Sequence, residues 1–96
     1  MTDRYAYPAI FYYAEDGVSI EFQDLQVCLP CADTTEEALK NAKEALGLHL
    51  YGMESDGEEI PPPSDIKDIE VEDGGVLVLI DVFMPVVRDR INNRYV

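Results

Sequence analysis

Aromatic and aliphatic residues dominate the start of the chain and predict two strands joined by a tight turn. Residues 5–14 carry apolar side chains on both alternating faces, which is typical of a central strand covered on both sides. Glu15-Asp16-Gly17 predicts a hairpin turn, because glycine readily adopts positive φ. Apolar and polar positions separate cleanly over residues 18–22, so this segment is expected to be a half-buried strand. A looser third strand is expected over residues 26–31.

A long amphipathic helix follows these strands. Its capping pair is either Thr34 with Glu37 or Asp33 with Glu36. Its expected apolar stripe, at steps of three and four residues, is Leu39, Ala42, Leu46, Leu50 and Met53. Gly47 costs a helix about 1 kcal/mol relative to alanine, which suggests close packing or a bend at that point.

The back of this helix changes character along its length. Its first turns present polar residues there, namely Glu37, Lys40, Asn41 and Glu44. Leu48 and Tyr51 occupy the same face further on, and burying each of these side chains contributes about 1.5 to 3 kcal/mol. Cover by later parts of the same chain is the commoner arrangement, but little of this chain is free to provide it. We therefore expect Leu48 and Tyr51 to contact a partner protein or a second copy.

The C-terminal third predicts one further strand. Pro61-Pro62-Pro63 is a stiff, extended connector. After Gly74-Gly75, residues 76–83 form an apolar run that belongs inside a sheet. Residues 1–83 are therefore expected to form one α+β domain with the order strand, strand, strand, helix, strand. Residues 84–96 are mixed in composition and are expected to be a C-terminal linker or arm.

Charge is the strongest signal in the composition. Twenty acidic residues against seven basic ones give a net charge of −13 over 96 residues. Such a surface repels nucleic acid and attracts basic proteins, with solubility alone as the alternative explanation. Three of the bases, Arg88, Arg90 and Arg94, lie in the last nine residues. They are candidate DNA or linker contacts, with a solvated tail that pairs with the acidic body as the alternative.

Few residues offer catalytic or metal-binding chemistry. Cys28 and Cys31 form a Cys-x-x-Cys pattern before the helix, which occurs in redox proteins and also at the ends of ordinary strands. His49 is the single histidine, so a zinc site with these cysteines lacks ligands. A two-metal site needs a cluster of carboxylates, and Asp81 is the one acid inside a predicted buried strand. We therefore expect no enzymatic activity, no metal and no cofactor.

The chain is expected to act in the cytoplasm, away from membranes. Its longest apolar run is far shorter than the roughly 20 residues that a membrane-spanning helix needs. The polar start, Met1-Thr2-Asp3-Arg4, is unlike a signal peptide.

Two spaced motifs flank the helix. The first reads Phe22-x-Asp24-Leu25-x-x-Cys28-x-x-x-x-Asp33-Thr34-x-x-Glu37-Ala38, and the second reads Gly57-x-x-Ile60-Pro61-x-Pro63-Ser64. Together with the aromatic first strand, they resemble the HicB antitoxins over residues 5–64. The chain departs from that family where Gln23 and Gln26 replace prolines and where Val27 and Ala32 replace glycines. These replacements remove turn-forming residues, so we expect the fold to be kept and make no carry-over of the contacts that this loop makes in relatives.

The resemblance implies a fold, a partner and a role. Its members have a small antiparallel-rich sheet with one helix packed on it, similar to a reduced ribonuclease H-like fold. They neutralise small, basic, messenger-RNA-cleaving toxins of the HicA type, and many bind DNA through a further C-terminal domain. After residue 83 this chain has little room for such a domain, so we expect a shortened form or a stand-alone inhibitor.

The resemblance also directs attention to candidate contacts. The candidate toxin contacts are Glu21, Asp24, Glu44, Leu48 and Tyr51. A homo-oligomer, either a dimer or a tetramer, is expected, and DNA is expected to be contacted only indirectly or through a domain absent here. The alternative function is a small redox or regulatory module that uses Cys28 and Cys31.

Overall fold

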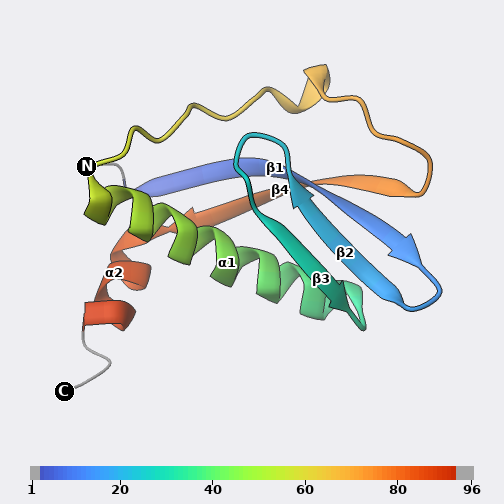
Figure 1. The fold of residues 1–96 in the computed structure, drawn as a ribbon, viewed down its shortest axis with the longest axis horizontal. Coiled ribbons are helices and arrows are strands. Elements are labelled where there is room, and N and C mark those ends of the chain that lie inside the picture. Colours follow the sequence, from blue (N-terminus) through green and yellow to red (C-terminus); the bar gives the residue numbers. More distant parts are fainter. Residues whose placement is uncertain (1–2, 93–96) are drawn as a thin grey trace.

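The strands of this protein form a single antiparallel sheet, and a long helix packs on one of its faces (Figure 1). The computed structural model describes residues 3–92, except for the side chains of residues 28, 30 and 31. Within that range the elements are β1 (Arg4–Ala14), β2 (Gly17–Phe22), β3 (Cys28–Ala32), α1 (Thr35–Asp56), the 3-10 helix η1 (Ile66–Asp68), β4 (Gly75–Phe83) and α2 (Met84–Asn92). The spatial order of the sheet is β3-β2-β1-β4. The expected α+β class is confirmed.

β1 is the central strand, as its aromatic residues predict. It pairs with β2 along its second half and with β4 along most of its length. Alternate residues point to opposite faces of a strand. Tyr7 and Phe11 belong to the core beneath α1, and Pro8 and Ile10 on the other face are also almost completely buried. Both faces of β1 therefore exclude water, although the helix covers only one of them.

The second cover comes from residues 58–74, which we call the strap. In Figure 1 the strap leaves the end of α1, runs along the outside of the sheet and returns to the start of β4. A Cβ atom on Gly75 would lie 2.9 Å from Ile10 Cγ2 and 2.8 Å from Val71 Cγ1. Val71 of the strap and Ile10 of β1 therefore both pack against Gly75, where a larger residue would not fit.

α1 is capped at both ends, and its N-cap is the first of the two that the sequence offers. Thr34 Oγ1 accepts a hydrogen bond from the backbone N–H of Glu37 at 3.1 Å. Gly57 ends the helix in the left-handed conformation, with φ of 72°. The residues it buries are Ala38, Ala42, Leu46, Gly47 and Leu50. The expected stripe is therefore wrong at Leu39, which is 36% exposed, because the small side chain of Ala38 faces the sheet instead.

α2 was not foreseen from the sequence, which suggested a linker or arm from residue 84. Residues 84–92 instead form a helix that packs against α1, and Met84 is completely buried. Gly47 makes this contact possible, since a Cβ atom there would lie only 3.0 Å from Val87 Cγ2. Of the two explanations that the sequence offers for Gly47, close packing or a bend, the structure confirms close packing. Residues 93–96 lie outside the described part of the chain.

Candidate protein-binding surface

The described residues show little that suggests catalysis. No group of three or more His, Cys, Asp or Glu side chains within them is placed to hold a metal ion. No polar or charged residue among them is buried. In the same part of the chain, neither helix has the length and apolar character needed to cross a membrane. The side chains of Cys28 and Cys31 lie outside the described part, which gives only their backbone, in β3.

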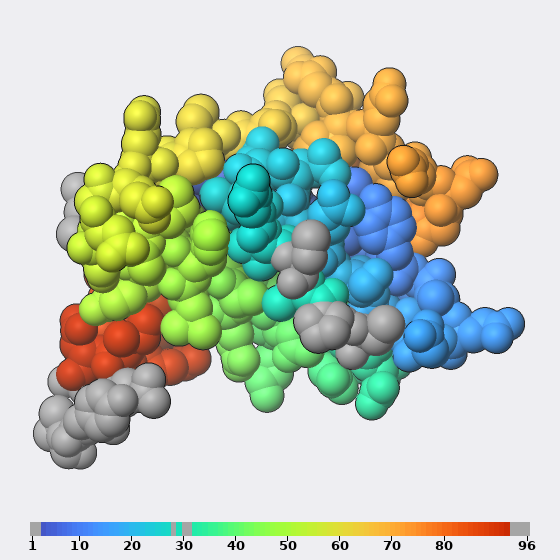
Figure 2. All heavy atoms as spheres, viewed as in Figure 1, coloured from blue at the N-terminus to red at the C-terminus, as the bar shows by residue number. Residues whose placement is uncertain are grey.

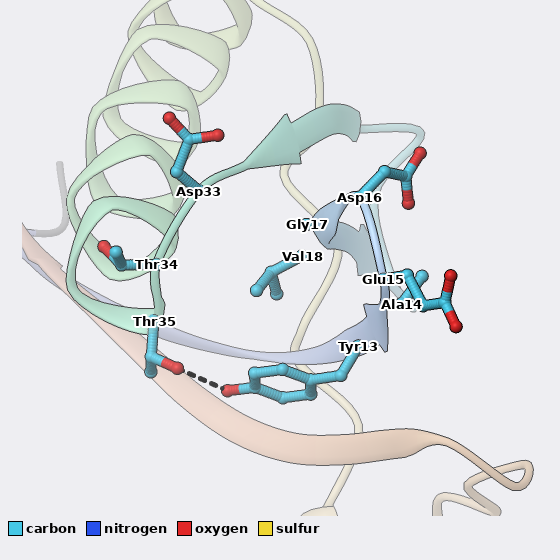
Figure 3. Close-up of a pocket in the computed structure, with 9 residues that line it drawn as sticks. All are labelled: Tyr13, Ala14, Glu15, Asp16, Gly17, Val18, Asp33, Thr34 and Thr35. Carbon is cyan, nitrogen blue, oxygen red and sulfur yellow. Dashed lines mark hydrogen bonds between the residues drawn. The ribbon is translucent and has the colours of Figure 1, made fainter.

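One polar hollow lies between the β1–β2 turn and the start of α1 (Figure 3). Tyr13 spans it, with its hydroxyl 2.8 Å from Thr35 Oγ1. Glu15 and Asp16 lie on the turn, and Asp33 lies on the opposite side of the hollow, so the three carboxylates do not converge. The Tyr13–Thr35 contact ties the hairpin to the helix, which is a structural role.

The five candidate contact residues fall in separate places. Glu21 is exposed on β2, whereas Asp24 lies in the loop between β2 and β3. Glu44 and Leu48 lie together beside α2. Tyr51 is half-buried, and its hydroxyl donates a hydrogen bond of 2.9 Å to Asn92 Oδ1 in α2. α2 therefore holds Tyr51 within the chain, while Leu48 remains 60% exposed.

Asp24 joins the two sequence motifs. The backbone N–H of Ser64 donates to Asp24 Oδ2 at 2.9 Å, and the Ser64 hydroxyl donates to Asp24 Oδ1 at 2.5 Å. Nearby, the Tyr7 hydroxyl donates to the carbonyl oxygen of Pro61. Burial, followed by the proximity of Tyr5 and Asp24, raises the pKa of Tyr7 and keeps this donor neutral. Both Asp24 oxygens thus hold the strap against the rest of the domain, in what we call the Asp24–Ser64 clamp.

Removing this clamp should loosen the strap without unfolding the domain. We expect Asp24→Ala combined with Ser64→Ala to lower the free energy of unfolding by about 0.5 to 1.5 kcal/mol, because the lost hydrogen bonds are exposed. Urea denaturation would measure the loss, and amide hydrogen exchange would locate it in the strap. Glu59→Ala, at another exposed strap position, is the matched control and should change neither. Unchanged strap exchange in the double variant would show that the clamp contributes nothing.

Arg88 is held inside the chain, although the sequence made it a candidate DNA contact. Its guanidinium donates to both carboxylate oxygens of Glu54, at 3.1 Å and 2.7 Å, and to Asp3 Oδ1 at 3.0 Å. These bonds, with the one to Glu54 foremost, raise the pKa of Arg88 above its already high usual value. Arg90, by contrast, is exposed on α2, and Arg94 lies outside the described residues. The structure therefore sets Arg88, which is held by acidic side chains, apart from the exposed Arg90.

Negative charge gathers on the strap. Residues 58–74 contain seven acids and a single base, and all seven acids are exposed. The strap forms one border of the molecule in Figure 2, yellow to orange, while α2 lies at the opposite side in red. Because the Asp24–Ser64 clamp fixes the strap, these carboxylates form a held acidic surface rather than a loose tail.

A different surface lies between α1 and α2. The α1–α2 groove is lined by Glu44, Leu48, Val87, Arg90 and Ile91. An adjoining hollow shares Glu44, Val87 and Arg90 with it and adds Arg4, Lys43, Asp81, Val82, Phe83 and Val86. Leu48, Val86 and Phe83 are 60%, 49% and 44% exposed, so apolar surface is open to water here. Arg4 and Lys43 both lie 3.4 Å from Asp81, with Arg4 also over the Phe83 ring.

Sequence reasoning missed this groove because it missed α2. The signal was present, since Met84, Val87 and Ile91 recur at helical spacing and Pro85 suits a first helical turn. Nine residues make a weak periodic pattern. Gly47, against which this helix packs, also lies far away in the sequence.

The sequence is similar to a protein family and to two curated proteins. Residues 7–94 match the family described as HicB-like antitoxin of bacterial toxin-antitoxin systems. The protein named Antitoxin HicB 2 of Photorhabdus laumondii subsp. laumondii is 36% identical over 72 residues, covering 75% of this chain and 52% of the relative. A 14.9 kDa protein from the rep-hol intergenic region of Haemophilus phage HP1 is 38% identical over 61 residues, covering 64% and 46%. The chain thus spans about half the length of these curated relatives.

Solved structures show the same fold. A chain in a toxin-antitoxin complex from Streptococcus pneumoniae aligns with a TM-score of 0.78 at 21% identity, covering 86% of this chain and 71% of that one. A chain in the HicA3 and HicB3 toxin-antitoxin complex aligns with a TM-score of 0.64 at 26% identity, covering 81% of this chain and 98% of that one. The family match extends over nearly the whole sequence and agrees with the motifs around the helix and with this fold. The chain belongs to the HicB-like antitoxin family of bacterial toxin-antitoxin systems.

Proposed function

We propose that this chain neutralises a small, basic, messenger-RNA-cleaving toxin of the HicA type by binding it. The observation that carries the proposal is the family match over residues 7–94. The similarity to a chain in the HicA3 and HicB3 complex supports it, because that relative was solved together with a toxin. Binding rather than catalysis is the proposed activity, and it acts where messenger RNA lies, in the bacterial cytoplasm.

The charge distribution supports this kind of partner. A protein that binds RNA phosphates needs a basic surface, and the exposed carboxylates of the strap offer an opposite charge to it. An acidic partner that occupies such a surface excludes RNA from it. Opposite charges also accelerate encounter, by about 10-fold to 1,000-fold at low salt. Nothing on the described residues favours the redox alternative or autoregulation, and neither is part of the proposal. The likeness to a reduced ribonuclease H fold stays a prediction.

Co-expression tests the function directly. A basic HicA-type toxin, which we expect a neighbouring gene to encode, should arrest growth when expressed alone, and co-expression of this chain should relieve the arrest and give a complex that co-purifies. An unrelated protein of similar size and net charge is the control, since it should not protect the cells. Toxicity that persists although this chain is soluble would refute the proposal.

Salt should slow the encounter between the two proteins. The Debye length falls from about 30 Å at 0.01 M salt to about 8 Å at 0.15 M, so the association rate constant should fall by at least about tenfold over that range. Stopped-flow mixing would measure it, with Glu21→Gln and Glu44→Gln testing two of the predicted contacts. Asp24 is less suitable, because changing it would also open the clamp. A rate that does not depend on salt would mean that the charge serves solubility alone.

A further inference from the structure

The two edges of the sheet differ in how well they could pair with another chain. The order β3-β2-β1-β4 leaves one side of β3 and one side of β4 without a neighbouring strand among the described residues. β3 is a poor template, because it has five residues, its register with β2 shifts, and Pro30 carries no backbone N–H. β4 has nine residues, no proline and one charge, Asp81. A long, apolar edge strand of this kind readily pairs with another extended chain.

The register of β4 shows which of its backbone groups face the open side. In an antiparallel pair, successive residues alternate between bonding the neighbouring strand and turning both backbone groups away from it. Tyr13 N–H donates to the Gly74 carbonyl oxygen at 3.1 Å, whereas Gly75 N–H turns away from β1 and donates to the Glu72 carbonyl oxygen at 3.0 Å. Alternation from Gly75 gives the next outward residues, which are Leu77, Leu79 and Asp81. Within residues 3–92, their outward backbone groups meet no backbone partner.

Side chains leave the first half of this edge open. Val76 and Leu79 lie on opposite faces of β4, and they are 48% and 53% exposed. An added strand would therefore find apolar side chains to pack against on both faces. Towards the other end of β4, Arg4 and Lys43 both pair with Asp81, so the charge of this aspartate is already compensated.

The approach to β4 favours a basic partner. Residues 69–74, the end of the strap, contain the exposed acids Glu70, Glu72 and Asp73 and no base. A second copy of this chain carries the same acids and a net charge of −13, so charge disfavours it at this edge. An extended segment with lysines or arginines has the complementary charge.

We propose that an extended segment of the toxin adds to the sheet as a fifth strand beside β4. It bonds the outward backbone groups of Leu77, Leu79 and Asp81, and its basic side chains meet the acids at the end of the strap. The inference rests on the proposed function, because the toxin is the occupant. It adds the main chain of β4 to the contact, which the five candidate side chains do not include. Since the strap leads directly into β4, one partner can reach both.

Amide hydrogen exchange resolved by residue with NMR tests this pairing. In the co-purified toxin complex, the amides of Leu77, Leu79 and Asp81 should exchange about tenfold or more slower than in the free chain. The amides between them already bond β1 and should change less. A contact through side chains alone would not produce this alternation.

The possible results separate the inference from the proposed function. If the complex forms but the three amides exchange as in the free chain, the inference is wrong and the proposed function stands. Protection of these amides in the chain alone, rising with its concentration, would assign the edge to a second copy and would also overturn the inference. Absence of any complex would refute the proposed function, and this inference with it.

A proline variant provides a second test. Leu79→Pro removes an N–H that points away from β1 and fills its place with the ring, so it should block the added strand while the β1 pairing remains. We expect toxin binding to weaken by about tenfold or more, because a carbonyl oxygen of the partner would be left unpaired. Leu79→Val is the matched control, since valine has as many side-chain carbons as proline but keeps the N–H.

Thermal melts followed by circular dichroism would establish that both variants fold. Leu79→Val should bind the toxin within about threefold of the unchanged chain, since it keeps every backbone bond. A folded Leu79→Pro variant that binds as well as Leu79→Val would overturn the inference. If Leu79→Pro does not fold, the exchange measurement on the unchanged chain decides.

Discussion

Phe11→Ala is expected to lower the free energy of unfolding by about 3 to 5 kcal/mol, the usual range for removing a buried phenylalanine. Phe11 is completely buried in the middle of the central strand, where it lies between Ile20 of β2 and Val76 of β4. The lost ring would leave a cavity that neither the sheet nor α1 can fill without moving. Because domains of this size are stable by only about 5 to 15 kcal/mol, much of the total would be lost.

Urea denaturation followed by circular dichroism would measure this change. Tyr13→Ala is the control, since Tyr13 lies on the same strand and the same face but is 44% exposed. Its loss should be clearly smaller, although it also removes the hydroxyl that meets Thr35. Equal losses at the two positions would mean that the core is not centred beneath α1.

Arg88→Met is expected to cost about 1.5 to 3 kcal/mol and to release α2 from α1. The guanidinium bonds Glu54 through two of its nitrogens and Asp3 through the third, and the side chains of Arg88 and Glu54 are only 18% and 9% exposed. Methionine keeps most of the length of the side chain but leaves the Glu54 carboxylate without these donors. An ion pair as sheltered as this one is costly to break from one side.

Hydrogen exchange of residues 84–92, together with urea denaturation, would detect the release. Lys40→Met provides a control on an exposed part of α1 and should leave both measurements unchanged. Adding Glu54→Met to Arg88→Met should recover part of the lost stability, because the sheltered carboxylate is then gone and the Asp3 carboxylate, which also loses Arg88, is 64% exposed. If Arg88→Met leaves α2 protected, apolar contacts such as that between Val87 and Gly47 are enough to hold it.

The parts of this fold that the sequence predicts are those encoded locally. The hairpin follows from alternation and a glycine turn, and α1 follows from its caps and periodicity. Periodicity did not fix the rotation of α1, because Ala38 rather than Leu39 faces the sheet. Which apolar residue faces inward depends on how closely the helix approaches the sheet. That distance cannot be predicted from the sequence of the helix alone, because it also depends on the residues of the sheet.

The candidate contacts were harder to predict because they depend on distant partners. Asp24 was identified as an acid of a motif, but its partner Ser64 lies 40 residues further on, and no local pattern reveals the pair. Tyr51 and Leu48 share a face of α1. The position of α2 determines that Tyr51 is hydrogen-bonded to Asn92 while Leu48 stays exposed to water. The family resemblance depended on a set of residue types in a fixed order and spacing, which can be recognised without knowing the contacts that those residues make.

The Asp24–Ser64 clamp has a consequence for the order in which this protein folds. The hairpin closes over a two-residue turn, whereas the clamp must bring together groups 40 residues apart, and closing so long a loop costs more entropy. The strap should therefore dock last, and until it does, Ile10 on the face away from α1 stays in contact with water. The same few exposed bonds make the strap the first segment expected to open in the folded protein, while the sheet and α1 remain intact. A protease that cuts this protein should thus begin in the strap.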